Sequence, residues 1–246
     1  MRIACVSDIH GNYVALLAVF EDIRKRGIEI ILCTGDIVGY YPNPIECIEL
    51  VKKKINHTIR GNHDDAVITP DFGQQKNWFN PVARESLRWT REILEELDSS
   101  IHKSFLTSLS IQKELVFENK KVLLAHGTPD KPWEYFLYPY WADEPPPEYE
   151  LRIDRWFKNW DLVVIGHTHQ AYVHNSKISL KVLVNPGSVG QPRDFDPRAS
   201  YAILEIENSR IDAEIVRVEY DISETCKSIK QASLDDYLCE RLYAGR

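Results

Sequence analysis

Short apolar runs that each end in a potential metal ligand constrain this chain more than any other feature of its sequence. The first run, residues 2–7, precedes Asp8-Ile9-His10, and the last, residues 161–165, precedes Gly166-His167-Thr168-His169. Three further runs between them are followed by Gly35-Asp36, Gly61-Asn62-His63-Asp64 and Ala125-His126-Gly127. Such runs predict buried strands, and polar residues just beyond neighbouring strands meet at one edge of a sheet. The sequence therefore predicts a single polar site at that edge.

The side chains at these positions offer oxygen and nitrogen ligands but no thiolate. This mixture suits Mn, Fe, Co, Ni or Zn better than Ca²⁺, which takes oxygen ligands, or a structural zinc, which draws on Cys. We therefore predict two divalent transition-metal ions, with Mn as the first candidate. Two cations need a bridging ligand, and Asp36, with one oxygen for each ion, is the expected bridge. The predicted ligands are Asp8, His10, Asp36, Asn62, His126, His167 and His169.

The ordered set of motifs resembles the calcineurin-like metallophosphoesterase superfamily, whose pattern is D-x-H, G-D, G-N-H-D/E, a single H and G-H-x-H. Residues 35–44 and 185–194 look like its small, single-domain bacterial and archaeal phosphodiesterase branch. The resemblance covers roughly residues 1 to 206. It implies one metal bound by Asp8, His10, Asp36 and His169. It implies a second metal bound by Asp36, Asn62, His126 and His167, with His63 beside the departing oxygen.

Hydrolysis of a small phosphodiester is the activity that the ligand set and the resemblance favour. A hydroxide bridging the two metals would attack phosphorus in line. His63 is expected to assist the leaving group as a general acid or transition-state stabiliser, with Asp64 as a possible orienting carboxylate. A phosphomonoesterase or protein phosphatase and a dinucleoside polyphosphate hydrolase remain open alternatives. Some superfamily members are non-enzymatic scaffolds, but the presence of every ligand and of His63 favours an enzyme.

Arg193 is the first tentative substrate contact. It lies in a loop between Pro192 and Asp194. A guanidinium group matches two phosphate oxygens at once, so Arg193 could bind a phosphate. The alternative is a structural ion pair with Asp194 or Asp196.

The segment of residues 129–149, which follows His126, is rich in proline and aromatic residues. We interpret it as a lid or substrate wall, with Trp133 and Tyr138 as tentative contacts that could stack on a base. The rings could equally pack as a hydrophobic cluster or form a contact in a homo-oligomer. Either alternative would remove them from the active site.

Alternation of strand and helix dominates the first part of the chain. Helices are predicted over residues 12–26 and 44–54, and a β-α-β-α-β beginning implies parallel strands with right-handed crossovers. Later strands are mostly expected at hairpin spacing. The predicted fold class is α/β, with two packed mixed β-sheets forming a sandwich flanked by helices. We expect one domain, residues 1–246, with a helical insertion at about 65–110 and a C-terminal helical tail at about 221–246.

Length and composition fit one such domain. The chain has 246 residues, of which 43% are hydrophobic, enough to bury a large core. No stretch approaches the roughly 20 apolar residues that span a bilayer, and the first strand leaves no room for a signal peptide. We therefore expect a cytoplasmic protein that does not contact membranes. A net charge of -7 argues against broad nucleic-acid binding, so the expected partner is a small phosphate ester.

The cysteines indicate no disulfide. Their number is odd and no two of them form a C-x-x-C pair, so the sequence predicts neither a disulfide framework nor a thiolate metal site. Cys5 and Cys33 lie within predicted strands and are expected to be small core residues. The full set is Cys5, Cys33, Cys47, Cys226 and Cys239.

Overall fold

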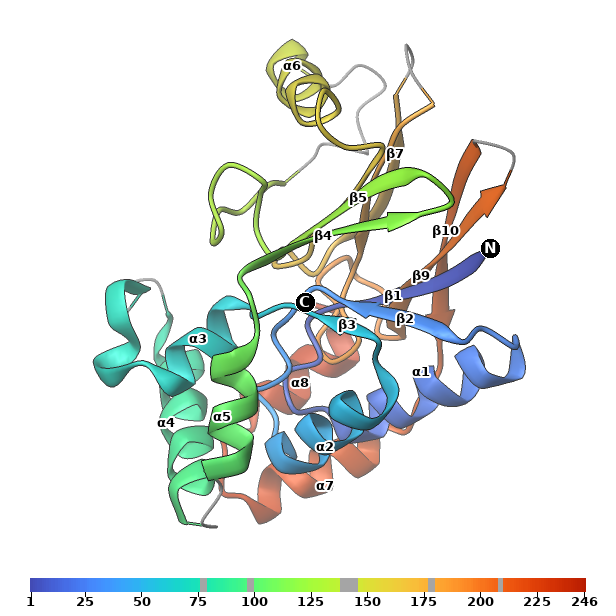
Figure 1. The fold of residues 1–246 in the computed structure, drawn as a ribbon. Helices are drawn as coiled ribbons and strands as arrows, with labels where there is room; N and C mark the ends of the chain where they lie inside the picture. Colours follow the sequence, from blue (N-terminus) through green and yellow to red (C-terminus); the bar gives the residue numbers. More distant parts are fainter. Residues whose placement is uncertain (76–78, 97–99, 138–145, 177–179, 208–209) are drawn as a thin grey trace.

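Two five-stranded sheets pack face to face at the centre of the molecule (Figure 1). The structure, a computed structural model, describes residues 1–75, 79–96, 100–137, 146–176, 180–207 and 210–246. The strands are β1 (Arg2–Val6), β2 (Ile30–Cys33), β3 (His57–Thr58), β4 (Gln112–Phe117), β5 (Lys120–Ala125), β6 (Leu162–Val164), β7 (Ala171–Asn175), β8 (Val182–Pro186), β9 (Ala199–Glu207) and β10 (Arg210–Val218). The first sheet has the order β10-β9-β1-β2-β3 and the second has the order β4-β5-β6-β8-β7. Both sheets are mixed, which confirms the predicted α/β class.

Helices cover the outer faces of the two sheets (Figure 1). Their bounds are α1 (Tyr13–Lys25), α2 (Pro44–Lys54), α3 (Asn62–Ile68), α4 (Pro81–Glu96), α5 (Ser100–Ser108), α6 (Pro147–Trp156), α7 (Ile222–Gln231) and α8 (Tyr237–Ala244). A 3₁₀ segment, η1 (Pro70–Gln75), follows α3. Helices α3 to α5 occupy most of the predicted insertion and lie together on one side of the molecule. Among the described residues, no helix has both the length and the apolar character that crossing a membrane requires.

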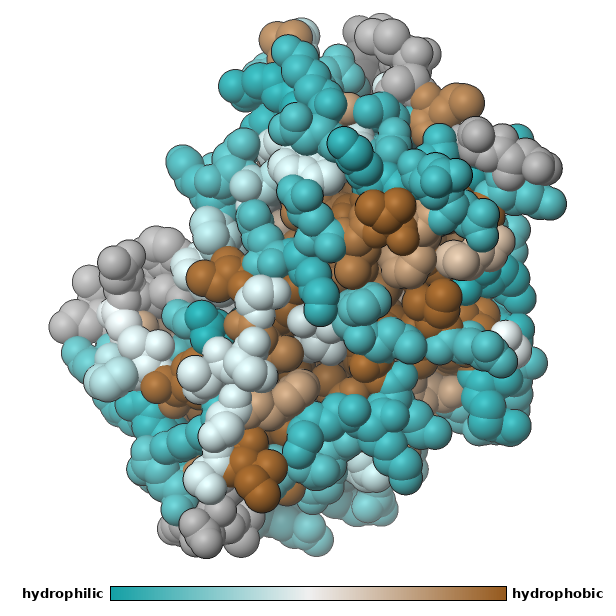
Figure 2. Space-filling model, viewed as in Figure 1, coloured by the Kyte–Doolittle hydropathy of each residue, from teal (hydrophilic) through white to brown (hydrophobic). Residues whose placement is uncertain are grey.

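Alternation of side chains along β1 explains how the layers form. Ile3 and Cys5 join the apolar cluster between the sheets, whereas Ala4 and Val6 face the helices. This two-residue period is the one a strand buried on both faces requires. A third cluster lies beneath α6, where Trp156 packs on the second sheet. Figure 2 shows apolar surface on the face that carries the β4–β5 hairpin.

Strand direction brings the predicted site residues to one edge. β1, β2 and β3 are parallel, and so are β5, β6 and β8. The pairs β4–β5, β7–β8 and β9–β10 are antiparallel, as hairpin spacing predicts. The connection that contains α6 makes β6 parallel to β5, which hairpin spacing did not predict. The carboxyl ends of the parallel strands consequently face the same region.

Helix α1 shows where periodicity alone misleads. Asn12 caps it by accepting a hydrogen bond from the Ala15 N–H over 3.2 Å, and Gly27 follows it with φ +66°. Leu17 has an apolar side chain but is 43% exposed, so an apolar residue in this helix is not always a buried one. Apolar residues occupy most of this helix, so several faces satisfy the same spacing. The buried set is Ala15, Leu16, Val19, Phe20 and Ile23.

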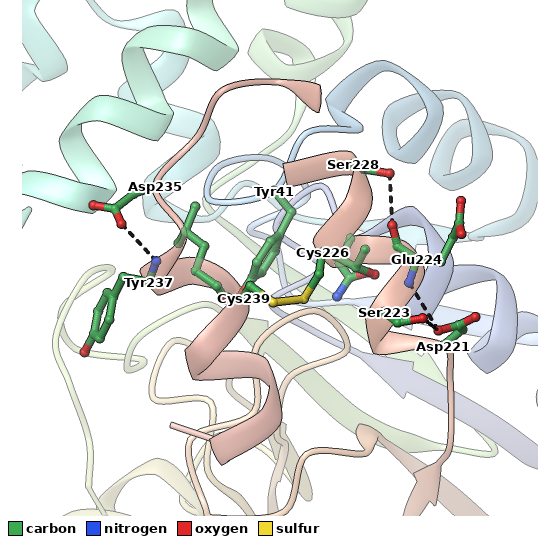
Figure 3. The surroundings of a disulfide bond; sticks show 12 residues. Tyr41, Asp221, Ser223, Glu224, Cys226, Ser228, Asp235, Tyr237 and Cys239 are labelled. Atoms are coloured by element: carbon green, nitrogen blue, oxygen red, sulfur yellow. Dashed lines mark hydrogen bonds between the residues drawn. A yellow bond between two sulfur atoms is a disulfide. The ribbon is translucent and has the colours of Figure 1, made fainter. Parts of the chain in front are cut away.

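The C-terminal tail contains a disulfide that the sequence analysis failed to predict. It forms two helices, α7 and α8, and Cys226 of the first is bonded to Cys239 of the second (Figure 3). The expectation of no disulfide was wrong, because an odd count and the absence of C-x-x-C say nothing about a pair 13 residues apart that folding brings to a Cα–Cα distance of 5.2 Å. The other three cysteines are free and buried, as expected of core residues.

Candidate metal centre

All seven predicted ligands lie buried in loops at the strand ends. Asp8 and His10 follow β1, Asp36 follows β2, and His126 follows β5 directly. The two remaining histidines follow β6, and Asn62 opens α3. None of these seven residues is more than 6% exposed: Asp8, His10, Asp36, Asn62, His126, His167 and His169. Buried polar groups at this density require partners or a bound ion.

The backbone at these positions is in a conformation that side chains disfavour. Asp8, His10 and Asp36 have φ values of 52°, 53° and 54°, and His167 and His169 have values of 69° and 60°. Left-handed backbone at non-glycine residues costs of order 1–3 kcal/mol and clusters at functional sites. Hydrogen bonds between the loops hold it here, since the Asp8 N–H donates to the Gly35 carbonyl at 3.0 Å and the His10 N–H to the Asp36 carbonyl at 2.9 Å. The loops after β1 and β2 therefore fix each other.

Three of the imidazoles present a lone pair to the centre of the site. Nδ1 of His10, His126 and His169 lies 3.2, 2.7 and 2.6 Å from the carbonyl oxygens of Val38, Thr34 and Gln191. A carbonyl only accepts, so each Nδ1 carries the proton. In a neutral ring, Nε2 is then an acceptor. This is the arrangement by which an outer carbonyl orients a metal-bound histidine.

Several of these acceptors face each other. Nε2 of His10 lies 3.1 Å from Nε2 of His169, and Nε2 of His126 lies 2.9 Å from Oδ1 of Asn62. Two lone pairs at such distances repel unless a proton or a cation lies between them. Oδ1 of Asp8 and Oδ2 of Asp36 point into the same space without a hydrogen-bond partner. The donor set therefore fits divalent cations bound by oxygen and imidazole nitrogen.

The predicted ligand atoms form two groups, and Asp36 belongs to the second. Those of Asp8, His10 and His169 lie within 4.8 Å of one another, and so do those of Asp36, His126 and His167. Oδ2 of Asp36 lies 3.3 Å from Nε2 of His126 and 3.6 Å from Nε2 of His10, whereas its Oδ1 accepts the His63 N–H over 2.7 Å. The geometry thus differs from the expected bridge with one oxygen per ion. A single oxygen, Oδ2, faces both groups.

Electrostatics at the centre show how strongly the buried charges interact. Burial raises the pKa of Asp8 to about 6, and nearby Asp36 acts in the same direction. Burial opposes ionisation of His126, but the carboxylates of Asp36 and Asp8 outweigh it and raise its pKa to about 9. Burial holds the pKa of His10 and His169 well below the usual range. Without a cation, protons must balance the carboxylates, and a divalent ion replaces them.

His63 lies at the wall of this centre. Its ring centroid is 4.6 Å from that of His10 and 4.7 Å from that of Tyr40, and its Nδ1 has no hydrogen-bond partner. Gly39 makes the position possible, since a Cβ there would lie 2.3 Å from His63 Nδ1. Ligand atoms of His10, Asp36 and His63 also lie within 4.8 Å of one another. Distance alone therefore permits His63 both beside a metal and next to its substrate.

Asp64 does not orient His63, in contrast to the tentative expectation. Its carboxylate accepts hydrogen bonds from the N–H groups of Ile37, Val38 and Gly61, at 2.9, 3.1 and 3.0 Å. These bonds connect the Asp36 loop to the start of α3. Gly61 allows the close approach, because a Cβ there would lie 2.1 Å from Asp36 Oδ1. Asp64 therefore acts on the backbone around the ligands and not on the proposed proton donor.

A cavity of about 120 Å³ opens beside the metal ligands and contains Arg193. The guanidinium donates to Gln191 Oε1 at 2.9 Å and to the hydroxyl groups of Tyr40 at 3.2 Å and Tyr135 at 3.3 Å. The alternative of a structural ion pair was wrong, because Asp194 pairs with Arg217 and Asp196 pairs with Arg198. The lining residues are Tyr40, Asn62, His63, Phe79, Asn80, Ala83, Tyr135, His167, Arg193 and Arg241.

The aromatic segment divides between the cavity and the core. Tyr135 packs against His167 with the ring centroids 4.0 Å apart and the ring planes tilted by 41°, and it is 53% exposed, whereas Phe136 is buried against Trp156. Trp133 packs edge-on against His126, at 6.1 Å, and does not line the cavity. Tyr138 lies outside the described residues. The described part of the segment thus contributes Tyr135 to the cavity lining and Phe136 to the core, and a contact with substrate stays a prediction.

Residues 1–209 match the calcineurin-like phosphoesterase superfamily domain. The chain belongs to this superfamily. The resemblance expected from the motifs is thereby confirmed, and superfamily membership supports a phosphoester hydrolase. The His/Asp groups of this calcineurin-like phosphoesterase suggest divalent metals.

Similar proteins are known from archaea and bacteria. An uncharacterised protein of Methanocaldococcus jannaschii is 39% identical over 99% of this chain and 98% of its own length. A metallophosphoesterase from Sphaerobacter thermophilus is 35% identical, with a TM-score of 0.76 and coverage of 100% of this chain and 99% of that one. A hypothetical protein from Pyrococcus horikoshii is 25% identical, with a TM-score of 0.82 and coverage of 100% and 98%. Their full-length coverage shows that the C-terminal tail has a counterpart in these proteins.

Sequence reasoning missed several residues of the cavity in this calcineurin-like phosphoesterase. Tyr40 lies only four residues after Asp36 and could have been proposed from that proximity. Phe79 and Asn80 precede α4, and Arg241 lies on α8, beyond the residues that match the superfamily. Nothing in their local sequence distinguishes them from other surface residues. Only folding brings them to the site.

Proposed function

We propose that this protein is a metal-dependent phosphoesterase that hydrolyses small phosphodiesters with two divalent transition-metal ions. The observation that carries the proposal is the set of buried Nε2 lone pairs directed at carboxylate oxygens that have no hydrogen-bond partner. When bound, two such ions supply Lewis acidity that activates water and neutralises phosphoryl oxygens. Mn is the first candidate among Mn, Fe, Co, Ni and Zn, because the ligands combine oxygen with imidazole.

The proposed ligands fall into the two sets implied by the superfamily. Asp8, His10, Asp36 and His169 would hold one ion. Asp36, Asn62, His126 and His167 would hold the other. The observed distances between ligand atoms support this division, and the single oxygen of Asp36 that faces both groups supports Asp36 as the shared ligand.

The remaining residues would act on the substrate itself. We assign His63 to the departing oxygen, because it lines the cavity without being needed in either ligand set. As a general acid it would donate a proton to that oxygen while the bond to phosphorus breaks. Arg193 would bind a phosphoryl oxygen through its guanidinium, which Gln191 and two tyrosine hydroxyls hold in place. Asp64 would keep the Asp36 loop in position.

The proposal extends to partners and location. A small phosphate ester is the proposed partner, because the cavity of about 120 Å³ is below the usual range for whole drug-sized ligands. A cytoplasmic location remains a proposal. The Cys226–Cys239 disulfide restricts this proposal, because disulfides persist in oxidising compartments or in the intracellular proteins of hyperthermophiles. A cytoplasmic location therefore fits the disulfide only in the second case.

The test is a combined metal and substrate screen. Purified protein would be stripped with a chelator, reloaded with Mn²⁺, Ni²⁺, Zn²⁺ or Ca²⁺, and analysed for metal content. Turnover would be measured with bis(p-nitrophenyl) phosphate, p-nitrophenyl phosphate and a dinucleoside polyphosphate. We expect Mn²⁺ or Ni²⁺ to restore activity better than Ca²⁺, and the diester to be turned over. Full turnover with less than one metal per chain would overturn the metal proposal, and turnover of the monoester alone would overturn the diester assignment.

A further inference from the structure

The C-terminal helix α8 places a second arginine, Arg241, in the cavity beside the metal centre. Arg241 and Arg193 line the same space as His63 and His167. The superfamily match ends at residue 209, so α8 lies outside the part of the chain that carries the shared motifs. A positive charge brought to the site from this tail is a feature of this chain that the metal motifs do not account for.

The two guanidinium groups lie around one aromatic ring. The Arg193 Cζ atom is 5.8 Å from the ring centroid of Tyr40, and the Arg241 Cζ atom is 5.7 Å from the same centroid. The His63 ring centroid is 4.7 Å from that of Tyr40. Tyr40 therefore places both arginines close to the residue that we assign to the departing oxygen. A group bound beside His63 lies within reach of both charges.

Among the described residues, no Asp or Glu side chain forms a direct ion pair with these arginines, and the Asp8 carboxylate acts on Arg193 only from a longer distance. The cavity lining contains no Asp or Glu, and no Asp or Glu carboxylate lies within 4.0 Å of either guanidinium. The Arg193 side chain donates only to neutral oxygens of Gln191, Tyr40 and Tyr135. Arg241 Nε donates to the main-chain oxygen of Arg246 at 2.7 Å. Positive charge in a partly enclosed site is costly unless an anion accompanies it.

Contacts with the loop that follows β2 and with the loop that carries Arg193 hold α8 where it is. The Tyr41 hydroxyl donates to the Leu238 carbonyl at 3.5 Å and accepts from Gln191 Nε2 at 2.9 Å. The Phe195 N–H donates to the Gly245 carbonyl at 2.8 Å. Figure 3 shows the disulfide that joins α8 to α7 beside Tyr41. Arg241 is therefore presented by a fixed element and not by a free chain end.

The positive charges of Arg193 and Arg241 indicate which substrates the cavity favours. A plain phosphodiester has two non-bridging oxygens and one negative charge, which two divalent ions can neutralise alone. The guanidinium groups of Arg193 and Arg241 then receive no counter-charge from the substrate. A third oxygen on the reacting phosphate, as in a monoester, or a second phosphate on the same molecule would supply it through charge-assisted hydrogen bonds. The small volume, about 120 Å³, suits an anionic group of this size.

We propose that Arg241 and Arg193 form an anion subsite that selects phosphate esters carrying a phosphoryl oxyanion in addition to the two oxygens of a plain diester. Arg241 is the specificity-determining residue of this pair. The inference rests on the proposed phosphoesterase function and names the substrate class of the same site: a diester with a second phosphate keeps the diester assignment, whereas a monoester would replace it.

The test compares substrate discrimination between variants of the metal-loaded protein. The substrates are bis(p-nitrophenyl) phosphate, p-nitrophenyl phosphate, and the p-nitrophenyl ester of thymidine 5′-phosphate with and without a 3′-phosphate. The variants are Arg241→Gln and Arg241→Lys, and the control is Lys230→Ala, which removes one charge from an exposed position on α7. The measured quantity is the ratio of kcat/KM for the more charged substrate to kcat/KM for its less charged counterpart.

Arg241→Gln should lower at least one of these ratios about tenfold or more, the usual effect of losing a hydrogen bond to a charged group. Arg241→Lys should recover part of the loss, and Lys230→Ala should leave the ratios unchanged. A change confined to p-nitrophenyl phosphate identifies the third oxygen of a monoester as the ligand, and a change confined to the 3′-phosphate pair identifies a second phosphate. Unchanged ratios in Arg241→Gln, with a melting temperature like that of the wild type, overturn the proposal. Absence of turnover in the wild type with every metal would instead overturn the proposed function.

Discussion

Oδ2 of Asp36 lies 3.3 Å from Nε2 of His126 and has no hydrogen-bond donor. The same oxygen is 3.6 Å from Nε2 of His10, while the other oxygen of the carboxylate accepts the His63 N–H. Oδ2 therefore faces both groups of ligands. The hydrogen bond from the His63 N–H to the other oxygen prevents the carboxylate from rotating. The position of Oδ2 makes Asp36 the most sensitive point of the proposed centre.

Replacement of Asp36 with Ala should therefore remove more metal than any other single ligand change. Loss of an outer-shell partner typically lowers metal affinity about 10- to 100-fold, and loss of a shared ligand should exceed that for both ions. Metal analysis after gel filtration, with activity measured in parallel, checks the expectation. Asp8→Ala is the matched control, because it removes a carboxylate from one ligand set and should leave about one ion per chain. Two tightly bound ions in Asp36→Ala would show that the bridge is another residue.

His63→Ala should retain both metals and lose about 10²- to 10⁴-fold in turnover, the usual contribution of general acid–base catalysis. The loss should be smaller for an ester with a very acidic leaving group, whose departing oxygen hardly needs a proton. Metal analysis and the two substrates together test the assignment. Loss of a metal from His63→Ala would place this histidine in the ligand set, and equal losses for both esters would leave only electrostatic stabilisation.

The pH dependence of the His63 contribution follows from its pKa. Burial is the largest cause that lowers the pKa of His63, Asp36 opposes it and Arg193 supports it, and together they give a pKa of about 4. Only the protonated ring donates a proton, so its fraction falls about tenfold per pH unit above that pKa. The ratio of kcat/KM of the wild type to that of His63→Ala should therefore fall as pH rises from about 6 to about 8. A flat ratio over this range would mean that His63 acts in its neutral form.

The ligand set could be predicted from sequence because each member follows a run of residues with a strand pattern. The order of strands in the sheets then brings Asp8, Asp36 and His126 together without further information. The position of Arg241 could not be predicted in this way, because it depends on how α8 packs against loops far away in the chain. The role of Asp64 could not be predicted in this way either. Its position next to His63 suggested a contact between the two side chains, but the Asp64 carboxylate instead accepts hydrogen bonds from backbone N–H groups.

The Cys226–Cys239 disulfide should stabilise the tail measurably. A loop of about 15 residues closed by a disulfide contributes about 3 kcal/mol in the chain-entropy description. The double variant Cys226→Ser/Cys239→Ser should therefore unfold at lower urea concentration, and reductant should shift the wild type to the same midpoint. Reductant should leave the double variant unchanged, which is the control. A wild-type midpoint that does not respond to strong reductant, together with two titratable thiols beyond the three buried ones, would show that the bond is not formed in solution.

Selection between nucleotide and simple esters should depend on Tyr135. In the proposed mechanism the metals and His63 contact only the phosphoryl group, so discrimination must come from residues that touch the remainder of the substrate. Tyr135 is half-exposed, packs against His167 and lines the cavity, whereas the nearby Trp133 does not line it. A ring that stacks on a base contributes about 1–3 kcal/mol to binding. Tyr135→Ala should therefore lower kcat/KM for a nucleotide diester about tenfold or more relative to methyl p-nitrophenyl phosphate.

Two matched variants separate stacking from other effects of this substitution. Tyr135→Phe removes only the hydroxyl that accepts a hydrogen bond from Arg193 and keeps the ring, so it should retain most of the discrimination. Phe136→Ala removes a buried ring that packs on Trp156, and it should lower the melting temperature without changing the ratio of the two substrates. If Tyr135→Ala lowers kcat/KM equally for both esters and also lowers the melting temperature, the ring is part of the core. A change in oligomeric state on size-exclusion chromatography would instead identify the segment as a subunit contact.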